Sequence, residues 1–230
     1  HFVQEHVHPA QRPRAAVRLL AEQGEVIAAD FLGHADQKGA GAAGGFRKSS
    51  YFEKFGGEYI MKEAMLYEKL ENLQVRCHLC QHRCTISEGH YGICAVRQNR
   101  GGVLYSLVYA KAIASHIDQI EKKPLFHFQP GSTSFSIATV GCNFHCPFCQ
   151  NSDISQMPRD MKEIAGQDFP PESVVRAALR RDCQSISYTY TEPTVYFEYA
   201  YDTARQAHAA GLKNVFVSNG YMTPETVKTV

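Results

Sequence analysis

Hydrophobic and polar positions follow a repeating order in the second half of the chain. Three short, mostly apolar runs have the length of buried strands: residues 135–140, 185–190 and 214–220. Two segments between them carry apolar positions at helical spacing: residues 171–181 and 194–211. Strand and helix therefore alternate, which predicts right-handed βαβ units and a parallel sheet. We expect an α/β fold.

The first half of the chain shows weaker patterns and divides the sequence into three parts. Residues 1–60 combine some helical periodicity with a Gly/Ala-rich stretch, and we interpret them as a poorly patterned extension. Residues 61–130 form a small Cys-rich lobe, in which residues 61–73 have the apolar spacing of a short amphipathic helix. Residues 101–118 predict short strands joined by a turn. Residues 131–230 form the α/β core.

The ends of the chain suggest a fragment of a longer protein. The sequence starts at His1 and not at a methionine. A helix is predicted to start near the last residues, with Thr223 as its N-cap and Pro224 at its first position. We therefore expect that the C-terminal part of the fold lies beyond residue 230.

Composition and charge exclude some partners. The 230 residues are 44% hydrophobic, enough for one sizeable domain, and 24 Lys and Arg nearly balance 23 Asp and Glu. Net charge thus gives no reason to expect a nucleic acid. No apolar stretch approaches the ~20 residues of a membrane span, and no signal peptide is readable, so we expect no membrane partner.

The chain has eight cysteines, and seven of them fall into two tight groups. Tight grouping without an export signal favours metal binding in a reducing compartment, so we expect a cytoplasmic protein. The eighth, Cys183, is isolated before a predicted strand, where a small buried apolar side chain is the simplest interpretation.

The first group has the spacing C-x2-C-x3-C-x9-C and consists of Cys77, Cys80, Cys84 and Cys94. Four thiolates at short spacing suit a closed tetrahedral site. Zinc and a second iron–sulfur cluster that relays electrons both remain open, with a slight preference for a structural metal, because a small loop-rich lobe gains stability from one.

The second group follows the first predicted core strand and has only three members: Cys142, Cys146 and Cys149. A [4Fe–4S] cluster is usually held by four thiolates, so three would leave one iron free for a small molecule. A non-catalytic zinc or iron–sulfur module, such as an electron-transfer protein, is the alternative hypothesis.

Polar residues also follow the next two predicted strands. Glu192 comes after the second and Asn219 after the third. Since parallel strands end at one edge of their sheet, we expect these side chains to meet the cysteine loop there.

The spacing C-x-x-x-C-x-x-C just after the first strand of a βα domain, with Phe148 before its last cysteine, resembles the signature of the radical S-adenosylmethionine (SAM) superfamily. The resemblance implies a partial TIM-like (βα)6 barrel, of which this chain would hold about three units. It also implies that a [4Fe–4S] cluster on the three cysteines cleaves SAM reductively to a 5′-deoxyadenosyl radical. The residues it assigns to SAM contacts are Phe148, Thr191, Glu192, Ser218 and Asn219.

Several further segments resemble relatives of pyruvate formate-lyase activating enzyme and, more closely, the radical SAM member of the AmmeMemoRadiSam system: "CHLCQHRC", "GICAVR", "EKKPLFHF", "PGS", "GCNFHCPFCQN", "YTYTEP" and "SNGY". This implies an electron donor such as flavodoxin or ferredoxin. The hydrogen-donor substrate stays open, with a protein glycine as one class that the resemblance suggests. The sequence departs from the family where Tyr190 and Thr191 replace two glycines, which puts a backbone contact to SAM in doubt.

Overall fold

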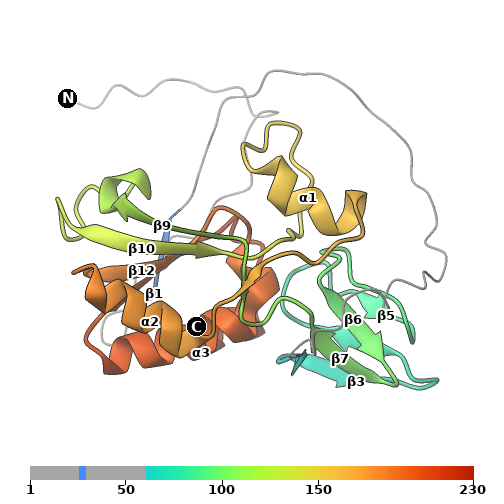
Figure 1. Cartoon of the computed structure of the whole chain (residues 1–230). Coiled ribbons are helices and arrows are strands. Elements are labelled where there is room, and N and C mark those ends of the chain that lie inside the picture. Colours follow the sequence, from blue (N-terminus) through green and yellow to red (C-terminus); the bar gives the residue numbers. More distant parts are fainter. Residues whose placement is uncertain (1–25, 30–60) are drawn as a thin grey trace, which may run out of the picture.

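The computed structural model describes residues 26–29 and 61–230. Its largest sheet has five strands (Figure 1). The strand order is β1-β13-β12-β10-β9. Strands β10, β12 and β13 are parallel to each other, β1 lies parallel to β13, and β9 lies antiparallel to β10. Their bounds are β1 (Val26–Ala29), β9 (Ala114–Gln119), β10 (Thr133–Ala138), β12 (Ser185–Tyr188) and β13 (Lys213–Val217).

Helices α2, α3 and α4 lie where the sequence pattern predicts helices, whereas α1 was not predicted. Helices α2 and α3 pack together along one face of the sheet (Figure 1), and α4 has Thr223 as its N-cap, as expected. None of the helices in the described ranges is long and apolar enough to cross a membrane. Their bounds are α1 (Ser152–Asp160), α2 (Pro171–Arg180), α3 (Phe197–Ala209) and α4 (Pro224–Thr229), with short 3-10 turns η3 (Ile120–Lys122) and η4 (Pro193–Tyr196).

The alternation of parallel strands and helices confirms the mixed α/β class. Within the described part of the chain the sheet does not close into a barrel. The partial (βα)6 barrel therefore remains a prediction.

Within the lobe predicted for residues 61–130, short strands form two three-stranded sheets, β2-β7-β6 and β3-β4-β5, whereas β9 belongs to the large sheet. The lobe itself therefore spans residues 61–112. Strand β8 extends from it and pairs with β11 of the core. The bounds are β2 (Lys62–Glu63), β3 (Tyr67–Lys69), β4 (Val75–Cys77), β5 (Thr85–Ile86), β6 (Arg97–Arg100), β7 (Val103–Ser106), β8 (Lys111–Ala112) and β11 (Gln167–Asp168).

The helix predicted for residues 61–73 is wrong. This segment forms β2 and β3, which pair with β7 and β4. Leu66, Asn72 and Leu73 adopt positive φ angles, which no α-helix allows. Strand pairing within the lobe overrides the local helical spacing, and Leu73 of the supposed apolar stripe stays 56% exposed.

The extension also differs from expectation at one point. Residues 26–29 lie in the stretch with some helical periodicity, but they form strand β1 at the edge of the large sheet. The remainder of residues 1–60 lies outside the described residues, so its interpretation as a poorly patterned extension stays a prediction.

Two apolar cores stabilise the described part of the fold, and Phe197 is one of the residues that join the lobe to the α/β part. The larger core lies between the sheet and its helices and includes Ile137, Ile186 and Phe216. The smaller core fills the lobe around Val75. Phe197, the first residue of α3, is buried in the lobe core, so the lobe and the α/β part share a hydrophobic interface.

A buried ion pair joins the same two parts. Arg97 of β6 donates from Nη1 and Nη2 to both carboxylate oxygens of Glu198 on α3, at 2.9 and 2.8 Å. The two side chains are 3% and 0% exposed. Glu198 also accepts from the backbone N–H of Met65 at 2.7 Å, and Arg97 donates to the Met65 carbonyl. The pair thus fixes the position of the lobe on α3.

Replacing Arg97 by Met should leave the Glu198 carboxylate buried and unpaired. We expect the free energy of unfolding to fall by about 3–5 kcal/mol. The double variant Arg97→Met/Glu198→Leu removes both charges and should recover most of this loss. Denaturant unfolding followed by circular dichroism measures the difference. If the double variant lost as much stability as the two single variants together, the expectation would be contradicted. The control is Lys62→Met, which breaks the half-exposed ion pair with Asp202 and should cost little stability.

Candidate functional site

The carboxyl edge of the parallel strands brings together the three segments that the sequence singles out. The Asn219 amide donates from Nδ2 to Oδ1 of Asn143 in the cysteine loop at 2.8 Å. The backbone N–H of Asn219 donates to Oε2 of Glu192 at 2.8 Å. The loops after β10, β12 and β13 are therefore connected by two hydrogen bonds, as the parallel sheet predicts.

Glu192 is the centre of this edge. Its side chain is almost fully buried and accepts four hydrogen bonds: from Asn219, from the hydroxyl of Ser218 at 2.8 Å, and from both the backbone and the hydroxyl of Thr194. Burial raises the pKa of this carboxyl, and the hydrogen bonds act in the opposite direction. In this arrangement Glu192 holds Ser218 and Asn219 in place.

The cysteine loop presents three free, partly buried thiols: Cys142, Cys146 and Cys149. The backbone N–H of Phe144 donates to Sγ of Cys142 at 3.4 Å, and Ser155 Oγ lies 3.5 Å from Sγ of Cys149. Burial raises the pKa of Cys142 to about 11 and also raises that of Cys146. A metal binding here would therefore have to displace thiol protons.

The residues present suit an iron–sulfur cluster with one open iron. The loop supplies three thiols, and the buried Asn143 amide has an Nδ2 without a hydrogen-bond partner among the described residues. Such an N–H can serve as an outer donor to a sulfur atom. Across residues 26–29 and 61–230, however, no three Cys, His, Asp or Glu side chains form a ready-made metal group. A cluster would have to draw the three sulfurs together.

Arg159 of α1, which the sequence analysis did not identify, shapes the cysteine loop. Its guanidinium donates to the carbonyls of Cys142 at 2.9 Å, Phe144 at 3.1 Å and Ile93 at 2.7 Å. Gln156 of the same helix also donates to the Phe144 carbonyl. Helix α1 was itself missed, because "SDISQMPRD" carries few apolar residues. Only the position of this polar segment directly after the cysteines could have suggested its role.

The other residues assigned by the resemblance lie around the same edge but differ in exposure. Thr191 is buried, and its hydroxyl donates to the Thr139 carbonyl at 2.8 Å. Ser218 is buried against Glu192, as described above. Phe148, between the second and third cysteines, is 47% exposed and free to contact a ligand.

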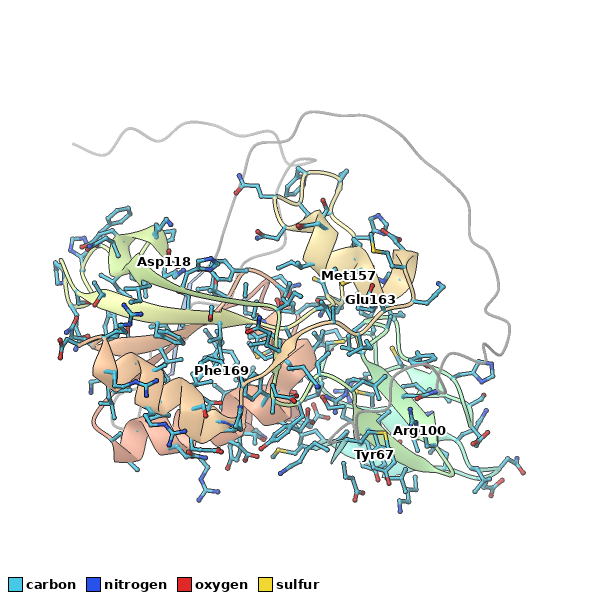
Figure 2. The ribbon with its side chains drawn as sticks, in the orientation of Figure 1. Tyr67, Arg100, Asp118, Met157, Glu163 and Phe169 are labelled. Atoms are coloured by element: carbon cyan, nitrogen blue, oxygen red, sulfur yellow. The ribbon has the colours of Figure 1, made fainter. Side chains whose placement is uncertain are left out.

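Tyr190 adopts a left-handed conformation with φ of 64°, the backbone region that favours glycine. The backbone at Tyr190 is thus glycine-like, at one of the two positions where the resemblance described above implies glycine. The Tyr190 hydroxyl donates to Asp118 of β9, which also accepts hydrogen bonds from Lys122 and Lys123. Asp118 is labelled in Figure 2. These contacts, together with a hydrogen bond from Asn151 to the Tyr190 carbonyl, hold the loop in its strained conformation.

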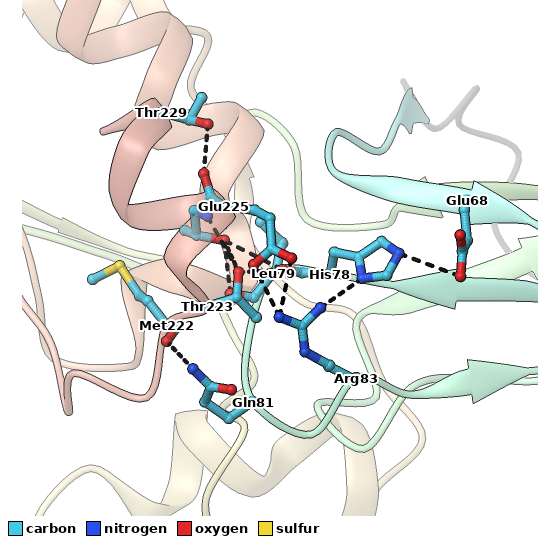
Figure 3. Close-up of polar contacts among 10 residues, drawn as sticks. Glu68, His78, Leu79, Gln81, Arg83, Met222, Thr223, Glu225 and Thr229 are labelled. Carbon is cyan, nitrogen blue, oxygen red and sulfur yellow. Dashed lines mark hydrogen bonds and ion pairs between the residues drawn. The ribbon is translucent and has the colours of Figure 1, made fainter.

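The first cysteine group lies next to this edge. Cys80 forms an isolated β-bridge with Met222, and the backbone N–H of Gln81 donates to the Tyr221 carbonyl at 3.0 Å. Nη2 of Arg83 donates to both carboxylate oxygens of Glu225 on α4 (Figure 3). The loop that carries Cys80 and Cys84 is therefore bound to the segment that follows Asn219.

Comparison with known proteins points to one superfamily. Residues 136–230 match the family model of the Radical SAM superfamily. Over 170 residues the chain is 51% identical to the uncharacterized protein MJ0808 of Methanocaldococcus jannaschii, covering 74% of this chain and 50% of that protein. It is 31% identical over 145 residues to the uncharacterized protein MJ0674 of the same organism, covering 60% and 37%. The chain thus spans half or less of the length of these relatives. No solved structure matches it.

The contacts of Asp118 with Lys122, Lys123 and Tyr190 should make the free energy of unfolding depend on pH. Burial alone would raise the pKa of Asp118, but hydrogen bonds from Lys123, Tyr190 and Lys122 lower it well below its usual value. Its contribution, on the order of 2 kcal/mol, should be present at pH 7 and lost as the pH falls from about 5 toward the lowered pKa. The stability difference between the wild type and Asp118→Asn should shrink over this range. A difference that stays constant between pH 7 and pH 3 in urea unfolding would contradict it.

Proposed function

We propose that this chain is the cluster-binding part of a radical SAM enzyme. Cys142, Cys146 and Cys149 would ligate a [4Fe–4S] cluster, and Thr191, Glu192, Ser218 and Asn219 would form the SAM-binding edge, with Phe148 as a further SAM contact. The observation that carries the proposal is the hydrogen-bonded connection of the cysteine loop, Glu192 and Asn219 at one edge of the sheet. The match of residues 136–230 to the Radical SAM superfamily supports it.

Such a cluster, when bound and reduced by an external electron donor, would supply the one electron needed to break the sulfonium S–C5′ bond of SAM, with methionine and a 5′-deoxyadenosyl radical as the products. The chain's own residues bind and orient. The buried carboxylate of Glu192 keeps Ser218 and Asn219 at fixed positions. Arg159 donates hydrogen bonds to the carbonyls of Cys142 and Phe144 and so holds the backbone of the cysteine loop in place.

We also propose a more specific reaction, which rests on the resemblance of several sequence segments. The segments shared with relatives of pyruvate formate-lyase activating enzyme and with the AmmeMemoRadiSam radical SAM member support an activase-like oxidoreductase that takes hydrogen from a protein glycine. A flavodoxin or ferredoxin would donate the electron. Eight free cysteines accord with a reducing, cytoplasmic location.

Cys146→Ala should abolish cluster binding, because only two thiolates would remain in the loop. After anaerobic reconstitution we expect about four irons per chain in the wild type and almost none at this site in the variant. The low-temperature EPR signal of the dithionite-reduced protein, and its change of shape on adding SAM, should vanish together. Cys183→Ala, at a buried cysteine that precedes the amino end of β12 and belongs to neither group, is the matched control. Undiminished SAM cleavage by Cys146→Ala would refute the proposed ligand set.

Glu192→Gln should leave the cluster in place but weaken SAM binding about tenfold. The amide offers one acceptor oxygen in place of two, and Ser218 and Asn219 donate to different oxygens, so one of them loses its acceptor. Isothermal titration of the reconstituted protein measures the affinity, and iron content checks the cluster. Glu172→Gln on the exposed side of α2 is the control. Equal SAM affinity in both variants would show that Glu192 does not organise the binding edge.

A further inference from the structure

Four cysteines outside the proposed catalytic loop share one small cavity. Cys77, Cys80, Cys84 and Cys94 all line a space of about 20 Å³ within the lobe. A Cβ atom placed on Gly92 would lie 3.8 Å from Sγ of both Cys84 and Cys94, so these two thiols face the same point. The loop is closed by a hydrogen bond from the Cys77 N–H to the Cys84 carbonyl at 3.0 Å.

The size of the cavity selects the occupant. A volume of about 20 Å³ holds one water-sized object. A single metal ion meets this limit, whereas a [4Fe–4S] core has eight atoms and is larger. We infer that Cys77, Cys80, Cys84 and Cys94 bind one Zn²⁺ ion in a closed tetrathiolate site. Binding would draw the sulfurs inward, since in this structure they line the space without forming a closed ligand group.

A buried cation beside the cavity gives an independent reason for a metal–thiolate centre. Arg97 lines the same space and is 2% exposed. Its terminal nitrogens bind Glu198 and the Met65 carbonyl, but its Nε has no hydrogen-bond partner among the described residues. Four thiolates around Zn²⁺ carry a net charge of −2, so a guanidinium N–H directed at a sulfur would satisfy both groups.

The zinc site has a structural consequence for the neighbouring loops. The segment containing Cys80 and Arg83 forms the β-bridge to Met222 and the ion pair to Glu225 shown in Figure 3. Ile93, next to Cys94, offers its carbonyl to Arg159, which also holds the cysteine loop. Zinc would thus brace the segments on which the proposed SAM site is built, without itself taking part in electron transfer.

The test is elemental analysis and zinc K-edge X-ray absorption of the full chain purified with zinc and without iron. We expect one Zn²⁺ per chain with four sulfur neighbours at about 2.3 Å. Cys84→Ser should lose this zinc, whereas Cys183→Ser should keep it. The triple variant Cys142→Ala/Cys146→Ala/Cys149→Ala should also retain one zinc per chain, and this result is independent of whether the chain cleaves SAM.

Three outcomes would overturn the inference. The first is a zinc shell dominated by nitrogen or oxygen, and the second is loss of zinc in the triple variant. The third is an iron–sulfur signal in the triple variant after reconstitution with iron and sulfide in the presence of zinc. Arg97→Lys keeps the charge but lacks the Nε donor, so zinc affinity measured by chelator competition should fall about tenfold. Arg76→Lys, on an exposed ion pair, should leave that affinity unchanged.

Discussion

The buried pairing of the Arg97 guanidinium with the Glu198 carboxylate determines how the two parts of this molecule meet. A buried charge without an opposite charge beside it is strongly unfavourable. The lobe therefore packs on α3 in the one position where Nη1 and Nη2 of Arg97 meet both carboxylate oxygens of Glu198. That position sets the loop around Cys80 beside the end of β13. It also brings the Ile93 carbonyl within reach of Arg159. The geometry of the cysteine loop therefore depends in part on an ion pair in which none of its own residues takes part.

The sequence predicted the core elements and failed in the lobe for a physical reason. Strands β10, β12 and β13 and helices α2 and α3 have apolar runs or stripes that match their burial, so local pattern and tertiary structure agree. Residues 61–73 have helical spacing, but in the structure they form the short strands β2 and β3, which pair with β7 and β4, and three of their residues adopt left-handed backbone conformations. Helix α1 was missed because it is stabilised by polar contacts to a loop and not by an apolar stripe.

The candidate site was predictable as far as topology dictates it. Cysteines, Glu192 and Asn219 follow parallel strands, and the edge of such a sheet necessarily gathers them. Arg159 and Asp118 could not be predicted, since they act on carbonyls and on a tyrosine hydroxyl far away in sequence. Tyr190 shows a related limit. Its backbone adopts a left-handed conformation typical of glycine, which a tyrosine in the sequence does not predict.

Phe197 has a consequence for the modularity of the protein. This residue belongs to α3 in sequence but is buried in the lobe among Val75, Leu79 and Ile86. A cut near residue 130, where the sequence pattern changes, would expose this aromatic ring on one product and open a cavity in the other. The lobe and the α/β part are therefore poor candidates for separate expression or for domain exchange, and they should be inherited as one unit.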